Sequence, residues 1–391
     1  MRGKPTFYEF FAGGGMARAG LGESWTCSFA NDFSEMKARA YTSNWGSDHF
    51  IPGDVGKITT AQLPGRADLT WASFPCQDLS LAGKYRGLGE ASSEVMTRSG
   101  TFWPFWKLMT TLREESRAPK LVVLENVTGA ITSRDGRDFE AICMSLSEAN
   151  YRFGAVVVDA RHFVPQSRPR LFFIAVAEDV VVPIGLTSWA ADKQWHSPAL
   201  CAAQARLRGD AKSQWIWWNM ATPPARNIGF ADIIEEKPTH CRWHSKIETM
   251  RLMDMMTPLH LAKIKRARVT GARCVGGVYK RTRPDEFGIK RQRAEVRFDN
   301  IAGCLRTPAG GSSRQAIIVI EGEETRSRLL SPREAARLMG LNDEYKLPDR
   351  YNEAYHIAGD GVCVPVVRHL ADQILEPLLS TNACPSETIA A

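Results

Sequence analysis

The sequence has 391 residues, 44% hydrophobic and 24% charged, a composition typical of a folded globular protein with room for two domains. No run approaches eighteen consecutive apolar residues, so we expect no membrane-spanning helix. The net charge of +7 is concentrated, because residues 263–297 hold twelve Lys or Arg against three acidic residues. Such a stretch indicates either a polyanion-binding surface or a solvated basic face.

Cysteine usage and the N-terminal segment bear on the compartment. The nine cysteines occur singly, without a Cys-x-x-Cys pair, and the first residues show no signal-peptide pattern. Both features favour reduced thiols and a cytoplasmic location.

Residues 1–178 alternate between short apolar runs and amphipathic segments. We expect strands within 6–13, 25–32, 68–75, 120–127, 154–160 and 170–177. Helices are expected between them, including 101–115 and 137–149. This alternation predicts an α/β fold, a doubly wound parallel sheet with helices on both faces.

The alternation stops near residue 179. The region 179–342 is rich in Trp, Arg and Pro and predicts a smaller, irregular second domain. Its "QWIWWN" run (214–219) fits either the core of that domain or a stacking surface for bases. Ser331 and Pro332 predict a capped helix start, and residues 343–391, with a helix from about Val364, are expected to return to the first domain.

Three polar strand ends point to a nucleotide-like ligand. "FFAGGGMARAG" (10–20) places three glycines between a strand and a helix, where backbone N–H groups can approach a ligand. Asp32 ends the second strand and is placed to bind ribose hydroxyls, Phe33 could lie against a purine, and Asp54 follows a third strand. Together they predict an adenosine-containing cofactor, although a ligand-free turn and surface acids remain the alternative.

A second group carries reactive chemistry. Cys76, in "WASFPCQDLSLAG" (71–83), lies where a strand ends and a loop begins, and a thiolate is a strong nucleophile. Glu125 ends the very apolar strand 120–127, where a partly desolvated carboxyl can hold a proton. Gln166, Arg168 and Arg170 occupy alternate positions and would share one face of a strand. A nucleophile, an acid and arginines suit attack on an electron-poor ring.

The ordered motifs FAGGG, FPCQ, ENV, QSRPR, SPREAARLMG and a late Gly-x-x-Val-x-Pro-Val resemble the DNA (cytosine-5) methyltransferase family. The resemblance covers nearly the whole chain apart from a variable middle. It implies S-adenosylmethionine as cofactor, double-stranded DNA as substrate, and residues 179–342 as a target-recognition domain with a hinge.

The resemblance also implies a mechanism. Cys76 would add to C6 of cytosine, Glu125 would protonate or hydrogen-bond N3, and Arg170, with Arg168 in the same set, would hold O2. The cytosine would be flipped out of the duplex, with the loop 78–100 closing over it.

The family's cofactor-contacting positions correspond to Phe11, Gly13, Gly15, Asp32, Phe33, Asp54, Val55, Pro75, Phe102, Asp360 and Val362. One position departs from the family, whose usual Gly-Asn-(Ser/Ala)-Val is "GDGV" here, with Asp360 replacing the amide. A carboxylate there would either interact with the sulfonium charge or cap the helix that begins near Val364.

Expected DNA contacts, through phosphates or guanine edges, are Gln77, Lys280, Arg281, Arg283 and Arg306. No metal is expected, because the His240–His244 run offers only three clustered ligands. Expected partners include a restriction endonuclease acting on the same site, with the enzyme a bacterial or phage-encoded monomer.

The sequence also bears on three other functions. An RNA-directed member of the family would carry a Cys-Phe-Thr signature, which is absent. A catalytically silent homologue is disfavoured by Cys76 and Glu125, and a nicotinamide dehydrogenase by the incomplete GxGxxG.

Overall fold

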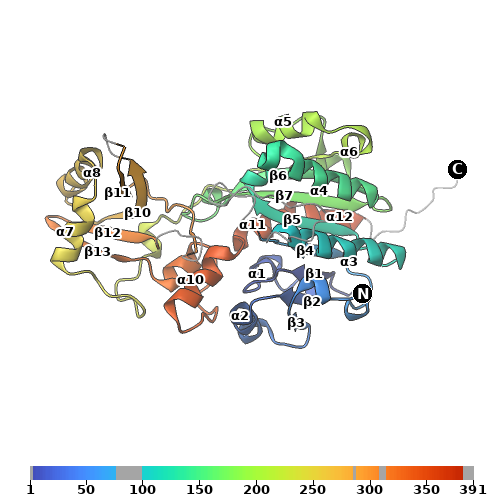
Figure 1. The fold of residues 1–391 in the computed structure, drawn as a ribbon, viewed down its shortest axis with the longest axis horizontal. Coiled ribbons are helices and arrows are strands. Elements are labelled where there is room, and N and C mark those ends of the chain that lie inside the picture. Colours follow the sequence, from blue (N-terminus) through green and yellow to red (C-terminus); the bar gives the residue numbers. More distant parts are fainter. Residues whose placement is uncertain (1–2, 76–98, 285–287, 308–313, 382–391) are drawn as a thin grey trace. The chain divides into compact units, whose positions relative to one another are not determined.

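The computed structural model describes residues 3–75, 99–284, 288–307 and 314–381, which form two compact units (Figure 1). Unit 1 takes residues 1–159, 169–223 and 362–391, and unit 2 takes 160–168 and 224–361. The helices are α1 (Met16–Leu21), α2 (Glu35–Trp45), α3 (Phe102–Glu114), α4 (Arg137–Glu148), α5 (Pro198–Arg206), α6 (Gly209–Ser213), α7 (Lys246–Asp254), α8 (Pro258–Val269), α9 (Pro332–Arg337), α10 (Tyr351–Asp360), α11 (Val364–Leu370) and α12 (Glu376–Thr381).

Unit 1 is built on a seven-stranded sheet in the order β3-β2-β1-β4-β5-β7-β6. Its strands are β1 (Thr6–Phe10), β2 (Thr26–Asp32), β3 (Phe50–Pro52), β4 (Leu69–Ala72), β5 (Leu121–Val127), β6 (Tyr151–Asp159) and β7 (Pro169–Ala177). β1 to β5 pair in parallel, whereas β7 runs antiparallel to both β5 and β6. The expected doubly wound α/β fold is confirmed, with one antiparallel strand that the pattern did not reveal.

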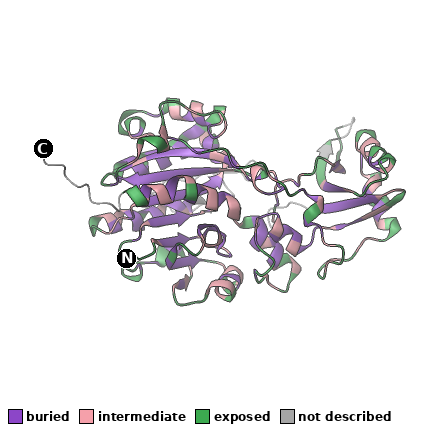
Figure 2. Cartoon of the chain, turned by 180° about the vertical axis from the view of Figure 1, so that it is seen from behind, coloured by how far each residue is buried: buried purple, intermediate pink, exposed green. Residues whose placement is uncertain are grey.

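Helices cover both faces of this sheet. α3 and α4 lie over one face, and α11 and α12 lie over the other (Figure 1). The apolar runs 121–124 and 171–176 are consequently fully buried (Figure 2). Continuous burial on both faces explains why these strands are uninterrupted apolar runs rather than alternating ones.

The segment 179–223 belongs to unit 1. It adds the two-stranded sheet β8 (Thr187–Ser188) and β9 (Trp217–Trp218), and Ile216 N donates to Phe153 O at 2.6 Å. A side chain at Gly154 would collide with Ile216 O at 1.9 Å, so glycine is required for this approach. Trp218 is buried and donates to Ile174 O at 3.1 Å. The "QWIWWN" run therefore packs against the large sheet.

Unit 2 contains a four-stranded antiparallel sheet rather than irregular structure. Its order is β11-β10-β12-β13, formed by β10 (Cys274–Pro284), β11 (Lys290–Arg297), β12 (Ala316–Glu321) and β13 (Glu324–Leu329). Its core includes Leu252 of α7, Met256 two residues beyond that helix, Ile264 of α8, and Ile318 and Ile320 of β12. Sequence analysis missed this sheet because Arg and Lys interrupt the alternating pattern of β10 and β11.

The unit boundaries at 159/160, 168/169, 223/224 and 361/362 lie elsewhere than the expected divisions at 178 and 342.

Across the described ranges, no helix has the length and apolar character needed to cross a bilayer. The seven cysteines within those ranges are all free thiols.

Candidate active site

Most of the predicted site residues gather at one edge of the large sheet. The carboxyl ends of the parallel strands β1 to β5 share this edge, and the antiparallel β7 begins there. The chain proceeds from β1 to β2 and β3 on one side and to β4 on the other, so the strand order reverses next to β1. Ligands of open α/β sheets bind at such a switch point.

The glycine turn after β1 has an unusual backbone. Phe11, Gly13 and Gly15 all have positive φ, at 55°, 58° and 77°. A Cβ on Gly15 would lie 2.3 Å from Nε1 of Trp45, which donates a hydrogen bond to Gly14 O at 3.1 Å. Glycine at position 15 is therefore needed both for its backbone conformation and for the approach of Trp45.

Asp32 holds this turn in place. Its side chain accepts hydrogen bonds from Gly13 N and Ser34 N, both at 2.8 Å, and is buried. Asn31 donates to main-chain oxygens of residues 51 and 53, which ties the end of β2 to the end of β3. Asp54 follows immediately and accepts from Gly56 N at 2.9 Å.

The residues at these three strand ends fit an adenosine-containing cofactor. Phe33 is 78% exposed although it adjoins buried Asp32, so a large flat apolar surface faces outward beside a carboxylate. A Cβ built on Gly13 meets no atom within 4 Å, which indicates open space above the turn. Carboxylates can accept hydrogen bonds from hydroxyl and amino groups, and an exposed ring can stack on a purine.

Glu125 and Arg170 form an ion pair at the same edge. Arg170 Nε lies 3.2 Å from Glu125 Oε1, and their side chains are 14% and 9% exposed. β5 pairs with β7 so that Glu125 faces Phe172 and Val127 faces Arg170, which makes the ion-paired residues diagonal neighbours. The structure thus brings together the expected acid and one of the expected arginines.

The segment that leads to Cys76 is anchored by Asn126. The Asn126 amide donates to Phe74 O at 3.1 Å and accepts from Val127 N at 2.8 Å. Cys76 and Gln77 lie outside the described residues, which end here at Pro75. Asn126 belongs to the ENV motif, but its anchoring role depends on the neighbouring strand and has no signal in the sequence.

Phe102 lies behind this wall. Its side chain is fully buried, and its ring contacts Phe74 at 5.4 Å and Trp106 at 5.8 Å between centroids. The aromatic cluster fixes the start of α3 against the end of β4. Val55, the other apolar residue expected near the cofactor, is likewise buried.

Gln166 and Arg168 do not share a strand with Arg170, contrary to expectation. β7 begins at Pro169, and residue 166 makes only an isolated bridge, to Ala302. Gln166 and Arg168 belong to unit 2, whereas Arg170 belongs to unit 1.

The contacts of Arg168 explain this separation. Its guanidinium is 2% exposed and donates to three main-chain oxygens, of Leu305 at 3.3 Å, Gly359 at 2.9 Å and Gly361 at 2.8 Å. These acceptors come from two distant segments of unit 2. Arg168 therefore holds those segments together.

The remaining predicted residues lie in several places. Asp360 is exposed at the end of α10, and Val362 is buried at the start of the returning segment of unit 1. The N-cap residue of α11 is Cys363, whose own side chain makes no cap hydrogen bond. Lys280 and Arg281 are exposed on β10, and Arg306 is exposed after β11.

A buried acid beneath the glycine turn was missed. Glu9 of β1 is 1% exposed, and its carboxyl accepts a hydrogen bond from Arg18 N at 3.4 Å. Burial raises the pKa of Glu9 to about 8. The Arg18 guanidinium donates to Tyr41 Oη at 3.2 Å and bonds His49 Nε2. Nothing in the strand pattern distinguishes Glu9 from a polar residue on an exposed face.

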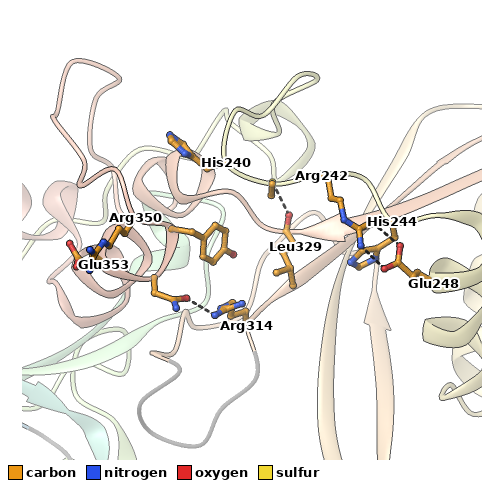
Figure 3. Close-up of a pocket in the computed structure, with 11 residues that line it drawn as sticks. His240, Arg242, His244, Glu248, Arg314, Leu329, Arg350 and Glu353 are labelled. Atoms are coloured by element: carbon orange, nitrogen blue, oxygen red, sulfur yellow. Dashed lines mark hydrogen bonds and ion pairs between the residues drawn. The ribbon is translucent and has the colours of Figure 1, made fainter.

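Unit 2 contains a cavity of about 730 Å³ (Figure 3). Its charged lining is largely paired within the unit, with Arg242 2.7 Å from Glu248 and Arg350 3.5 Å from Glu353. Burial raises the pKa of the Cys241 thiol, which disfavours the nucleophilic thiolate. No group of three or more metal-ligating side chains occurs among the residues that the structure describes. The cavity therefore lacks the features of a reactive centre.

Comparison with known proteins decides the family. The family model described as C-5 cytosine-specific DNA methylase matches residues 5–376. The chain belongs to this family. This cytosine-5 methylase is a DNA (cytosine-5-)-methyltransferase, and S-adenosylmethionine is its cofactor. The resemblance stated from the motifs is confirmed.

Individual relatives are distant but extend over the full length. The cytosine-5 methylase is 25% identical over 378 residues to type II methyltransferase M.NlaX of Neisseria lactamica, covering 96% of this chain and 97% of that protein. It is 26% identical over 396 residues to M.HpaII of Haemophilus parainfluenzae, covering 97% and 91%.

Solved structures share the fold. The Entamoeba histolytica methyltransferase EhMeth matches with a TM-score of 0.60 and 13% identity, over 98% of this chain and 100% of that one. The S. pombe Dnmt2 methyltransferase matches with a TM-score of 0.57 and 16% identity, over 96% and 99%.

Proposed function

We propose that this DNA methyltransferase methylates C5 of a flipped-out cytosine within a specific duplex sequence and that Cys76 is the nucleophile. The proposal rests chiefly on the Glu125–Arg170 ion pair, which lies at the same sheet edge as the glycine turn and the Asn126-anchored end of β4. Cys76 follows that anchored segment by one residue after Pro75.

In this mechanism the Cys76 thiolate adds to C6, which breaks the aromaticity of the ring and makes C5 nucleophilic. Glu125 hydrogen-bonds or protonates N3, and Arg170 donates to O2, so the negative charge created by addition is stabilised. When bound, S-adenosylmethionine supplies the methyl group that C5 accepts. Removal of the C5 proton by a base and departure of Cys76 then restore the aromatic ring.

The cofactor is held by the residues at the ends of β1, β2 and β3. Backbone groups of the glycine turn, the Asp32 and Asp54 carboxylates and the exposed ring of Phe33 provide hydrogen bonds and stacking. Pro75, Phe102, Val55 and Val362 would supply apolar surface next to the cofactor, and Asp360 is a carboxylate where the family's motif usually has asparagine.

We assign Arg168 a positioning role within unit 2 instead of contact with the base. Its guanidinium is engaged by three main-chain oxygens and has almost no exposed surface. This assignment separates the two arginines of the Gln-x-Arg-x-Arg motif, since only Arg170 pairs with Glu125.

DNA recognition is assigned to unit 2, with Lys280, Arg281, Arg283 and Arg306 contributing and Gln77 acting beside the nucleophile. Relatives named type II methyltransferases support a role in restriction–modification, with a cognate endonuclease acting on the same site. We place the enzyme in the cytoplasm of a bacterium, or of a phage-infected cell, as a monomer.

The decisive experiment compares wild type with Cys76→Ser. Transfer of tritiated methyl from S-adenosylmethionine to duplex DNA should be abolished in the variant, whereas cofactor affinity should remain nearly unchanged. Substantial residual transfer by Cys76→Ser would remove Cys76 from the nucleophile role. Bisulfite sequencing of the product would identify the methylated motif in the same experiment.

A further inference from the structure

Two strands of unit 2 extend beyond the sheet to which they belong. β12 pairs with β10 only along Cys274–Val278, whereas β10 pairs with β11 as far as Pro284 opposite Lys290. Residues 279–284 and 290–295 therefore form a two-stranded segment, called the β-ribbon below (Figure 1). Ala294, at the base of the ribbon, is buried in the core of unit 2 and bridges to Met256, whereas Thr282, Pro284 and residues 290–292 are exposed. A two-stranded ribbon exposed in this way is only marginally stable by itself.

The register divides the β-ribbon into two different faces. Arg281 lies directly opposite Arg293, and position 283 lies opposite Arg291. Because alternate residues of a strand point to opposite sides, Arg281, Arg291 and Arg293 share one face. Lys280 belongs to the other face, as do Thr282, Lys290 and Gln292.

The arginine face carries an excess of positive charge. Like charges placed directly opposite each other destabilise a strand pair, so the Arg281–Arg293 pair opposes the pairing of this ribbon. Among the described residues of the two strands, Glu295 is an acidic residue on the same face, and its carboxylate lies 3.5 Å from Arg281 Nε. That contact engages Nε and orients the guanidinium. The Nη1/Nη2 end is the end that makes bidentate contacts with a base.

The shape and chemistry of this face match the major groove of DNA. A two-stranded ribbon, with strands about 5 Å apart, fits a groove about 12 Å wide. Arginine bound bidentately to O6 and N7 of guanine is the commonest specific contact in that groove. Directly opposed residues such as Arg281 and Arg293 are separated by about 5 Å at Cα and can reach the same or adjacent base pairs.

We propose that the arginine face of the β-ribbon lies in the major groove of the substrate and that Arg281 and Arg293 recognise guanines in the target sequence. The inference rests on the proposed function of unit 2 in DNA recognition. Lys280 and Lys290, on the opposite face, then contribute attraction to DNA that does not depend on sequence.

The test compares sequence preference among matched variants of the full-length enzyme. Wild type, Arg281→Gln, Arg293→Gln, Lys280→Gln and Lys290→Gln would each methylate a duplex library randomised around a fixed cytosine, with methylated molecules identified by bisulfite sequencing. Each arginine variant should lose about tenfold or more in preference for guanine at one position. The lysine variants should keep the wild-type motif and show only a weaker dependence on salt.

Arg281→Lys and Arg293→Lys keep the charge but lose the planar fork, so they should relax the motif while retaining DNA affinity. An unchanged motif in all the arginine variants, or a wild-type motif without guanine, would overturn the inference. Failure of the proposed function has a different signature, namely no cytosine methylation by wild type or full methylation by Cys76→Ser. Matching thermal unfolding of every variant would show that the fold is intact.

Discussion

Replacement of Glu9 by glutamine should remove a pH dependence from the stability of unit 1. Glu9 is 1% exposed, and burial raises its pKa from 4.5 to about 8, despite the opposing effect of Arg18. The titratable groups around it are Arg18 of α1, Tyr41 of α2, Cys27 of β2 and, through Arg18, His49. Burial and Arg18 lower the pKa of His49, so a neutral imidazole accepts from Arg18.

The magnitude follows from the difference in proton binding between the folded and unfolded chain. Above pH 4.5 the unfolded chain releases the Glu9 proton, whereas the folded chain retains it until about pH 8. The stability contributed by protonated Glu9 is therefore fully present below pH 4.5 and is lost as the pH rises through about 8. At about 1.4 kcal/mol per pH unit, flattening near the folded-state pKa, the loss from about pH 6 to about pH 8 is roughly 2 kcal/mol.

Thermal unfolding of wild type and Glu9→Gln is measured at these two pH values. The effect of Glu9 is the stability difference between the two proteins at about pH 8 minus their stability difference at about pH 6. The variant, which cannot ionise, should gain several degrees relative to wild type at the higher pH. Glu115→Gln is the matched control, since a hydrogen bond from Thr60, together with Arg117, lowers the pKa of Glu115. The Glu115→Gln substitution should change the free energy of unfolding by the same amount at both pH values. An equal effect of Glu9→Gln at both pH values would mean that Glu9 does not titrate in this range.

Three other substitutions address the site. Gly15→Ala should lower the stability by about 1 kcal/mol or more and should weaken cofactor binding, because the new Cβ at φ 77° would lie 2.3 Å from Trp45 Nε1. An unchanged cofactor affinity in a calorimetric titration would contradict this. Glu125→Gln should slow methyl transfer far more than it weakens DNA binding, and equal losses in single-turnover and binding assays would indicate a structural carboxylate. Asp360→Asn should weaken binding of S-adenosylmethionine relative to the product S-adenosylhomocysteine, which lacks the sulfonium charge, and a constant ratio of the two affinities would exclude the charge interaction.

Several parts of the fold could be predicted from local sequence. The runs 120–127 and 170–177 were predicted as strands and correspond to β5 and β7, because a strand buried on both faces must be continuously apolar. The capped start at Ser331 was also predicted, since Ser331 accepts from Glu334 N at 3.1 Å and Pro332 occupies the first helical turn. These features depend on neighbours within a few residues along the chain.

The division between the units could not be predicted in this way. Residues 166 and 168 precede residue 170 by four and two positions, yet Arg168 joins unit 2 through the carbonyl oxygens of Gly359 and Gly361. Those acceptors are almost two hundred residues away in sequence, so no local periodicity reveals them. The direction of β7 could not be predicted either, because an apolar run does not indicate whether its neighbour is parallel or antiparallel.

The sequence by itself determined the alternation of strands and helices in residues 1–178, the residue types at the strand ends and the family, because motif residues and apolar periodicity are local properties. The tertiary structure alone decided which of those residues meet. It paired Glu125 with Arg170, placed Asn126 behind the segment leading to Cys76, and buried Glu9 under the glycine turn. It also separated the arginines of β10 and β11 from the lysines beside them. Each outcome follows from strand pairing between distant segments, which is set by the packing of the whole sheet.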